Sequence, residues 1–225
     1  MDIDNFCDAP LNDMPSLAQI GAHRVPMVAA SNDSLRGMGR LLDGFDPTDV
    51  VLVPWPTSGW RPLVPGTGAE GGTVVERFEM TREGGLQFAH NHAVQRRYLI
   101  GWYGDPATTT GSSEPADQTR LYTHEANYHP DGGQIFASRD GSPFVALLAP
   151  PGDDVNAQSF RAFWCDGRHA VHVDPGTWHQ PVFATRDVQV FDNAQGRVHA
   201  CVSVDFVAEF GTYLEVPLGL GDNDA

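Results

Sequence analysis

Short apolar runs separated by turn residues follow one another along most of the chain. Apolar and polar residues alternate over 73–80, and 84–103 continues this pattern, which predicts strands. Seven further apolar runs, separated by glycine, proline and aspartate, predict strands at 134–137, 143–149, 160–164, 170–173, 180–183, 188–191 and 198–204. Such even spacing is typical of an antiparallel sandwich or barrel, so the pattern predicts an all-β fold.

The N-terminal part reads differently. Residues 1–23 are polar and acidic, which predicts an arm that wraps around the domain or frays. A short apolar run at 24–30 predicts a strand. Residues 32–43 follow a capping serine and place apolar side chains such as Leu35 and Met38 at helical spacing, which predicts a short helix.

The remaining segments define the expected domain. A strand followed by a loop is expected from residue 50 onward, where prolines and glycines are frequent. Residues 104–119 are polar and of low complexity, which predicts a solvated, mobile loop. Residues 219–225 predict a disordered acidic tail, so 24–218 are expected to form one domain.

Composition narrows the classes of partner. The 225 residues include 24 glycines and 17 prolines, which suits many short strands better than long helices. The formal net charge of −15 disfavours binding to nucleic acid and to anionic membranes. A carboxylate ligand would then need a local cationic pocket, which makes each arginine near a site informative.

Cysteines and the N-terminus indicate the compartment. Cys7, Cys165 and Cys201 are odd in number and widely spaced, which argues against a disulfide framework and for reduced thiols. The chain begins Met1-Asp2 without the basic and apolar regions of a signal peptide. No apolar run approaches the roughly 20 residues that span a bilayer, so a cytoplasmic location is expected.

Two segments could supply metal-ligating or proton-transferring side chains from a strand. Alternate residues of a strand point to the same face, so His90 and His92 could both face the interior of a barrel. The other segment offers Asn127, His129 and Gln134, where a carboxamide takes the place of a carboxylate ligand. We assign this second segment as the first half of the site.

A second half follows in 173–179, where Pro175 and Gly176 precede His179. A histidine on a second strand completes a cluster with His129 and Gln134 that could hold a metal. His129 and His179 are the candidate catalytic residues, with Gln134 as a third, because neutral imidazole serves as both general base and metal ligand.

The chain resembles the ureidoglycolate lyase family of the cupin superfamily. The resemblance rests on four segments in the family's order and spacing, namely 129–136, 143–145, 161–163 and 178–181. It implies a cupin (RmlC-like) double-stranded β-barrel, or jelly roll, with a short N-terminal helix. It further implies a carbon–nitrogen lyase that cleaves ureidoglycolate to glyoxylate and urea in purine and allantoin breakdown, often as a homodimer. A divalent metal such as Ni, Mn, Zn or Fe could be held by His129, Gln134 and His179.

Arginines and aromatic residues provide the candidate substrate contacts. Arg161 or Arg97 would clamp the substrate carboxylate by a bidentate pair, and Arg161 is expected to be partly buried. His90, His92 and Trp178 complete the substrate-binding candidates, Trp178 with packing as the competing interpretation. The other histidines lack a motif and are interpreted as structural; they are His124, His169, His172 and His199.

Three alternatives remain open. Asp174, Gln180 and Phe206 depart from the family pattern, which favours a lyase or hydrolase acting on another α-substituted carboxylic acid. A second alternative is a non-catalytic cupin that binds a small metabolite. A third is an iron dioxygenase, which the missing carboxylate ligand disfavours.

Overall fold

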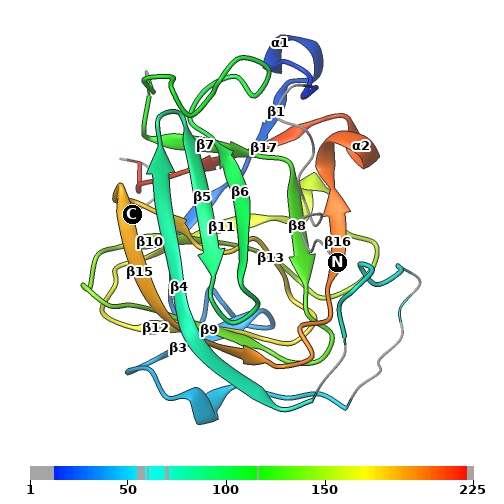
Figure 1. The fold of residues 1–225 in the computed structure, drawn as a ribbon, viewed down its shortest axis with the longest axis vertical. Helices are drawn as coiled ribbons and strands as arrows, with labels where there is room; N and C mark the ends of the chain where they lie inside the picture. The colour runs from blue at the N-terminus through cyan, green and yellow to red at the C-terminus, as the bar shows by residue number, and fades with distance from the viewer. Residues whose placement is uncertain (1–12, 55–58, 60, 69–70, 116, 222–225) are drawn as a thin grey trace.

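The computed structural model describes residues 13–54, 59, 61–68, 71–115 and 117–221 (Figure 1). The predicted tail beyond residue 221 and the first twelve residues of the predicted arm lie outside these ranges. Within them, none of the helices has the length and apolar character needed to cross a membrane.

Strands dominate the architecture, as the alternating pattern predicted. The larger sheet has ten strands, and Figure 1 shows β4, β5 and β6 side by side within it. In spatial order they are β1 (Ala22–Arg24), β17 (Tyr213–Pro217), β7 (Arg120–Thr123), β6 (Arg96–Trp102), β5 (Leu86–Asn91), β4 (Thr73–Glu83), β15 (Val188–Gly196), β9 (Gln134–Ser138), β12 (Ala170–Val173) and β3 (Gly39–Leu42).

The smaller sheet supplies the rest of the fold. In order its strands are β16 (Val202–Asp205), β8 (Glu125–Tyr128), β13 (Trp178–His179), β10 (Phe144–Ala149), β11 (Arg161–Cys165) and β2 (Met27–Ala29), with β14 (Phe183–Ala184) also pairing with β10. Nearly all pairings are antiparallel; β1 with β17 and β2 with β11 are parallel. The predicted all-β class is confirmed, and two such sheets are compatible with a cupin jelly roll.

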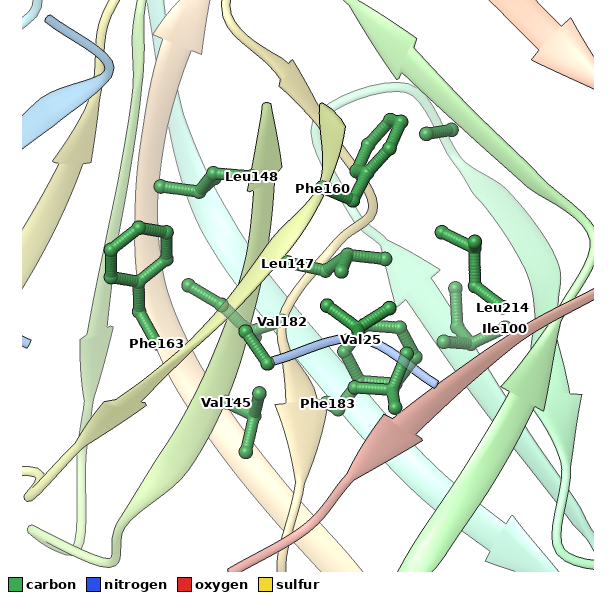
Figure 2. Close-up of a cluster of buried hydrophobic side chains, with 14 of the residues drawn as sticks. Val25, Ile100, Val145, Leu147, Leu148, Phe160, Phe163, Val182, Phe183 and Leu214 are labelled. Carbon is green, nitrogen blue, oxygen red and sulfur yellow. The ribbon is translucent and has the colours of Figure 1, made fainter. Parts of the chain in front are cut away.

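The main core consists of apolar side chains from both sheets. β10 is buried along its whole length, and Figure 2 shows its Val145, Leu147 and Leu148 among Phe160, Phe163 and other apolar side chains. Aromatic rings such as those of Phe144 and Phe191 pack edge to face, with centroids 5.1 Å apart. This core fixes the strands that position the polar side chains described below.

The helices are short. They are α1 (Leu17–Ile20), α2 (Phe206–Phe210) and the 3₁₀ turns η1 (Pro47–Asp49) and η2 (Ala157–Ser159). α1 and β1 occupy the described part of the predicted arm, and β1 pairs with β17.

The predicted helix over 32–43 was wrong. Residues 32–38 form turns, and the chain then enters β3, which pairs with β12. Gly37 has a φ of +82°, which a right-handed helix does not allow. The apolar spacing reflects burial of Leu35 and Met38 in the core from these turns.

Most predicted strands are present, with some local differences. The strand expected from residue 50 is reduced to an isolated bridge between Leu52 and Gly132. The two strands β7 and β8 were missed. The segment 104–119 forms turns and bends, apart from the undescribed residue 116, so its lack of strands and helices is confirmed where it can be seen.

Gly39 permits close approach of β3 to β12. A Cβ atom at this position would lie 2.2 Å from the backbone oxygen of His172, which is part of the paired strand. We expect Gly39→Ala to lower the free energy of unfolding by about 1–3 kcal/mol, because the strands must separate. Urea unfolding measures this, with Gly44→Ala as the control, since its Cβ would meet no atom within 4 Å. Equal stabilities of the two variants would contradict the expectation.

Candidate active site

A pocket lined by strands of both sheets contains His129, Gln134 and His179. His179 lies on β13 opposite Asn127 of β8, so the antiparallel pairing of two adjacent strands brings the two motif halves together. His129 follows β8 directly, and its ring centroid lies 5.1 Å from that of His179. The structure therefore brings together the three residues that the sequence proposed as catalytic and metal-binding.

Backbone carbonyl groups fix the tautomer of both imidazoles. The Nδ1 atom of His129 lies 2.9 Å from the Ala200 oxygen, and that of His179 lies 2.9 Å from the Thr177 oxygen. A carbonyl oxygen only accepts, so each Nδ1 carries the proton and donates. The Nε2 atom of each neutral ring therefore carries a lone pair.

Burial keeps both rings neutral. Desolvation lowers the pKa of His179 to about 3, with further lowering by the neighbouring His129. Burial also lowers the pKa of His129, which the Ala200 carbonyl and the Asp131 carboxylate partly oppose. Near neutral pH the two histidines are therefore available as proton acceptors or metal ligands.

The Gln134 side chain presents its carbonyl group to the histidines. Its Nε2 donates to Asn193 Oδ1 at 2.8 Å and to Gln195 Oε1 at 3.2 Å. Its Oε1 lies 3.3 Å from His179 Nε2, so two lone-pair atoms face each other. Such an arrangement attracts a group that supplies protons or positive charge.

These donors fit the divalent metal that the family resemblance suggested. Two imidazole nitrogens and a carboxamide oxygen are suitable ligands, although the neutral Gln134 contributes less attraction than a carboxylate would. A second group, His129, His199 and Cys201, has its ligand atoms within 4.8 Å of one another. Burial raises the pKa of the Cys201 thiol, so its sulfur is protonated without a cation.

Arg96 and Glu125 bring opposite charges to the pocket. They are the arginine and the glutamate among the described residues that line it. The Oδ1 of Asn127, another lining residue, is buried and has no hydrogen-bond partner in the described structure. A ligand with both a carboxylate and N–H groups would match these side chains.

The alternation of β5 and β6 places the other predicted residues outside this pocket. Asn91 pairs with Arg96, and both line the pocket. His90 pairs with Arg97 on the opposite face, where Arg97 binds Glu83 and stacks on Phe88. His90 and His92 stack with ring centroids 3.8 Å apart, and neither lines the pocket.

Arg161 and Trp178 are also not among the lining residues. Arg161 is exposed, contrary to the expected partial burial, because β11 directs the alternate residue Ala162 into the core. Trp178 is fully buried and donates from Nε1 to the Gly152 oxygen at 2.7 Å. Its packing against Tyr128, at 4.7 Å between centroids, favours the structural interpretation.

Sequence reasoning missed several lining residues. Arg96 adjoins Arg97, and choosing between them requires the register of β6, which the sequence does not give. Asn91 lies between His90 and His92, the two histidines that the sequence indicated as candidates. His199 and Cys201 follow a turn after β15, and no motif marked them.

Comparison with known proteins connects this pocket to a family. Residues 104–210 match the family model of ureidoglycolate lyase. This part of the chain, just under half of it, is therefore similar to the ureidoglycolate lyase family. The matched segment includes His129, Gln134 and His179, whereas Asn91 and Arg96 precede it.

Individual relatives agree. Ureidoglycolate lyase of Azotobacter vinelandii is 41% identical over 63 residues, which cover 28% of this chain and 38% of that protein. The enzymes of Salmonella paratyphi B and Salmonella typhimurium are each 35% identical over 71 residues, covering 32% of this chain and 44% of theirs. The chain thus spans less than half the length of these ureidoglycolate lyases in each match.

Proposed function

We propose that this protein is a carbon–nitrogen lyase that cleaves ureidoglycolate, an α-hydroxy-α-amido acid, to glyoxylate and urea. The observation that carries the proposal is the convergence of unprotonated acceptors in the pocket. His179 Nε2 and Gln134 Oε1 are 3.3 Å apart, and His129 adds a second imidazole. These acceptors suit a substrate with hydroxyl and amide protons to donate.

The charged side chains suit the two ends of this substrate. Arg96 would bind the carboxylate through charge-assisted hydrogen bonds, the role that the sequence had assigned to Arg97 or Arg161. Glu125 and the unpartnered Oδ1 of Asn127 would accept the N–H groups of the ureido end. The net effect is a fixed orientation of the reacting carbon relative to the histidines.

The reaction requires a base and a proton for the leaving group. His129 or His179 takes the hydroxyl proton through its free Nε2. The oxygen–carbon double bond then forms while the carbon–nitrogen bond breaks and its electron pair stays on the urea nitrogen. The imidazolium returns the proton to that nitrogen, so glyoxylate and urea leave and the base is restored.

A divalent cation would be held by His129, His179 and Gln134. When bound, it would supply Lewis-acid polarisation of a substrate oxygen. An Nε2 atom that holds the cation cannot also take the hydroxyl proton, so each histidine would act either as a metal ligand or as the proton acceptor. The fixed Nδ1–H groups leave both Nε2 atoms available for either role.

Another α-substituted carboxylic acid is the second candidate substrate. Of the three departures from the family pattern, Gln180 lines the pocket and donates to Thr123 Oγ1 at 3.2 Å. Asp174 instead pairs with His172, and Phe206 is buried in the core. Of these three residues, Gln180 would therefore have the largest effect on which substrate binds. We further propose that the protein is cytoplasmic and that it forms a homodimer. Light scattering tests the oligomeric state.

Substitution of the histidines tests this function. We expect the variant that removes the base, His129→Ala or His179→Ala, to lower kcat for urea release by about 10²–10⁴-fold, because a positioned general base contributes that much. His92→Ala is the matched control, since this histidine contacts Arg77 and His90 outside the pocket. Full turnover in both pocket variants would reject the mechanism.

A further inference from the structure

A chain of buried amides starts at a backbone N–H group. The Ala93 N–H donates to Asn91 Oδ1 at 3.0 Å. Because a backbone N–H only donates, the carboxamide of Asn91 must present its oxygen there and its nitrogen on the other side. That nitrogen lies 3.0 Å from the side chain of Gln195, whose facing atom must therefore be Oε1.

Two further amides confirm the orientation of Gln195. Gln134 Nε2 and Asn193 Nδ2 lie 3.2 Å and 3.4 Å from the same Oε1. If the Gln195 carboxamide were rotated so that its oxygen and nitrogen exchanged places, its NH₂ group would face the NH₂ groups of the three other amides. All four amides are at most 3% exposed, so water cannot compensate for such a clash.

This series of hydrogen-bonded amides ends at the His199 ring. Because Gln195 Oε1 accepts from the other amides, its Nε2 is directed toward His199 Nδ1, at 2.6 Å. An amide nitrogen only donates, so His199 Nδ1 accepts and the ring proton is on Nε2. His199 lines the pocket, and its Nε2 lies 3.8 Å from Cys201 Sγ. Its tautomer is thus opposite to that of His129 and His179.

The backbone supports a specific placement of this ring. His199 has a φ of +44°, a left-handed conformation uncommon outside glycine. The turn is closed by the His199 N–H to the Gly196 oxygen, and Asp131 accepts from the Ala200 N–H at 3.2 Å. Strained backbone held by its surroundings is concentrated at functional sites.

We propose that His199 is a neutral hydrogen-bond donor that binds the substrate carboxylate together with Arg96, and that Gln195 and Asn91 are positioning residues that fix its tautomer. The carboxylate role rests on the proposed function. Arg96 interacts electrostatically with His199, and both side chains line the pocket. They complement the acceptors His129, His179 and Gln134, because the substrate carries a carboxylate that accepts as well as hydroxyl and amide groups that donate.

The same hydrogen bonds disfavour metal binding by the second group of possible ligands, His129, His199 and Cys201. Both imidazole nitrogens near Cys201 Sγ, His129 Nδ1 and His199 Nε2, carry protons in this network. A cation there would have to displace both protons and break the contacts to Ala200 and Gln195. The cluster His129, His199 and Cys201 is therefore arranged for hydrogen bonding in preference to metal binding.

Nitrogen NMR of the imidazole rings tests the tautomer directly. Spectra of ¹⁵N-labelled full-length protein distinguish a protonated from an unprotonated ring nitrogen, and the signals lost in His199→Asn identify this ring. We expect protonated Nε2 and unprotonated Nδ1 in the wild type. In Gln195→Glu the new carboxylate accepts from Nδ1, which should become protonated. A wild-type ring protonated on Nδ1, or one averaging between tautomers, would overturn the inference.

Steady-state kinetics test the carboxylate contact. Asparagine tolerates the positive φ, so His199→Asn should fold while its shorter side chain loses the contact. We expect KM for ureidoglycolate to rise by roughly tenfold or more, the value of a hydrogen bond to a charged group, with a smaller change in kcat. His92→Asn should change neither. An unchanged KM would overturn the carboxylate role. Absence of turnover in the wild type would reject the lyase and this role, while the NMR result would still decide the tautomer.

Discussion

Arg96→Gln is expected to lower kcat/KM for ureidoglycolate by about a hundredfold, mostly through KM. The loss follows because a hydrogen bond to a charged group contributes about 1.5–3 kcal/mol, and the partly buried Arg96 would bind the substrate carboxylate in this way. Arg96 lines the pocket beside Asn91, and the charged side chain that also lines it, Glu125, repels a carboxylate. Without the arginine, the strongly acidic protein has little to hold an anionic substrate.

Arg97→Gln provides a closely matched control. It makes the same chemical change one residue later on β6, where the side chain is 47% exposed and pairs with Glu83. We expect kcat/KM to stay within about twofold of the wild type, because exposed ion pairs contribute little. A large loss in Arg97→Gln with none in Arg96→Gln would show that the original sequence-based assignment was right and that the pocket is misassigned.

Acidification below about pH 6.5 should destabilise the fold. The pKa of His179 is lowered to about 3 in the folded protein from an ordinary 6.5. Below pH 6.5 the unfolded chain therefore takes up a proton that the folded chain refuses, and unfolding becomes more favourable. This one residue lowers the free energy of unfolding by about 1.4 kcal/mol per pH unit, or about 2.7 kcal/mol at pH 4.5.

Urea unfolding at pH 7.5 and pH 4.5 measures this effect. His179→Gln removes the titrating group and should make the pH dependence shallower by about 2–3 kcal/mol between the two conditions. His169→Gln, which changes a side chain that is 40% exposed, should leave it as in the wild type. Carboxylates with lowered pKa, such as Asp140, lose their contribution only at lower pH. An unchanged slope in His179→Gln would contradict the buried, neutral assignment.

The parts of the site that the sequence predicted belong to two short motifs. His129, Gln134 and His179 were predicted to converge because their spacing resembled a known family, and β8, β9 and β13 bring them together. Arg97, one of the two predicted arginines, lies one residue from Arg96, which lines the pocket. A strand turns successive side chains to opposite faces, so without the register the sequence could not distinguish Arg96 from Arg97.

Other features depend on contacts distant in sequence. The apolar spacing of residues 32–43 indicated a helix, but Gly37 and the pairing of β3 with β12 override that local preference. His199 was interpreted as structural because nothing adjacent marked it. Its role follows from the chain Ala93, Asn91 and Gln195, whose members come from two strands and a turn.

The most direct test of the account is the products released from racemic ureidoglycolate. Urea and glyoxylate are measured with metal-free protein, then after addition of Ni, Mn, Zn or Fe, each against a blank without protein, because the substrate also decays unaided. We expect protein-dependent release of urea and glyoxylate in equal amounts, and its loss when the base, His129 or His179, is replaced by alanine. Release of ammonia in place of urea, or no release above the blank under any condition, would contradict the lyase function.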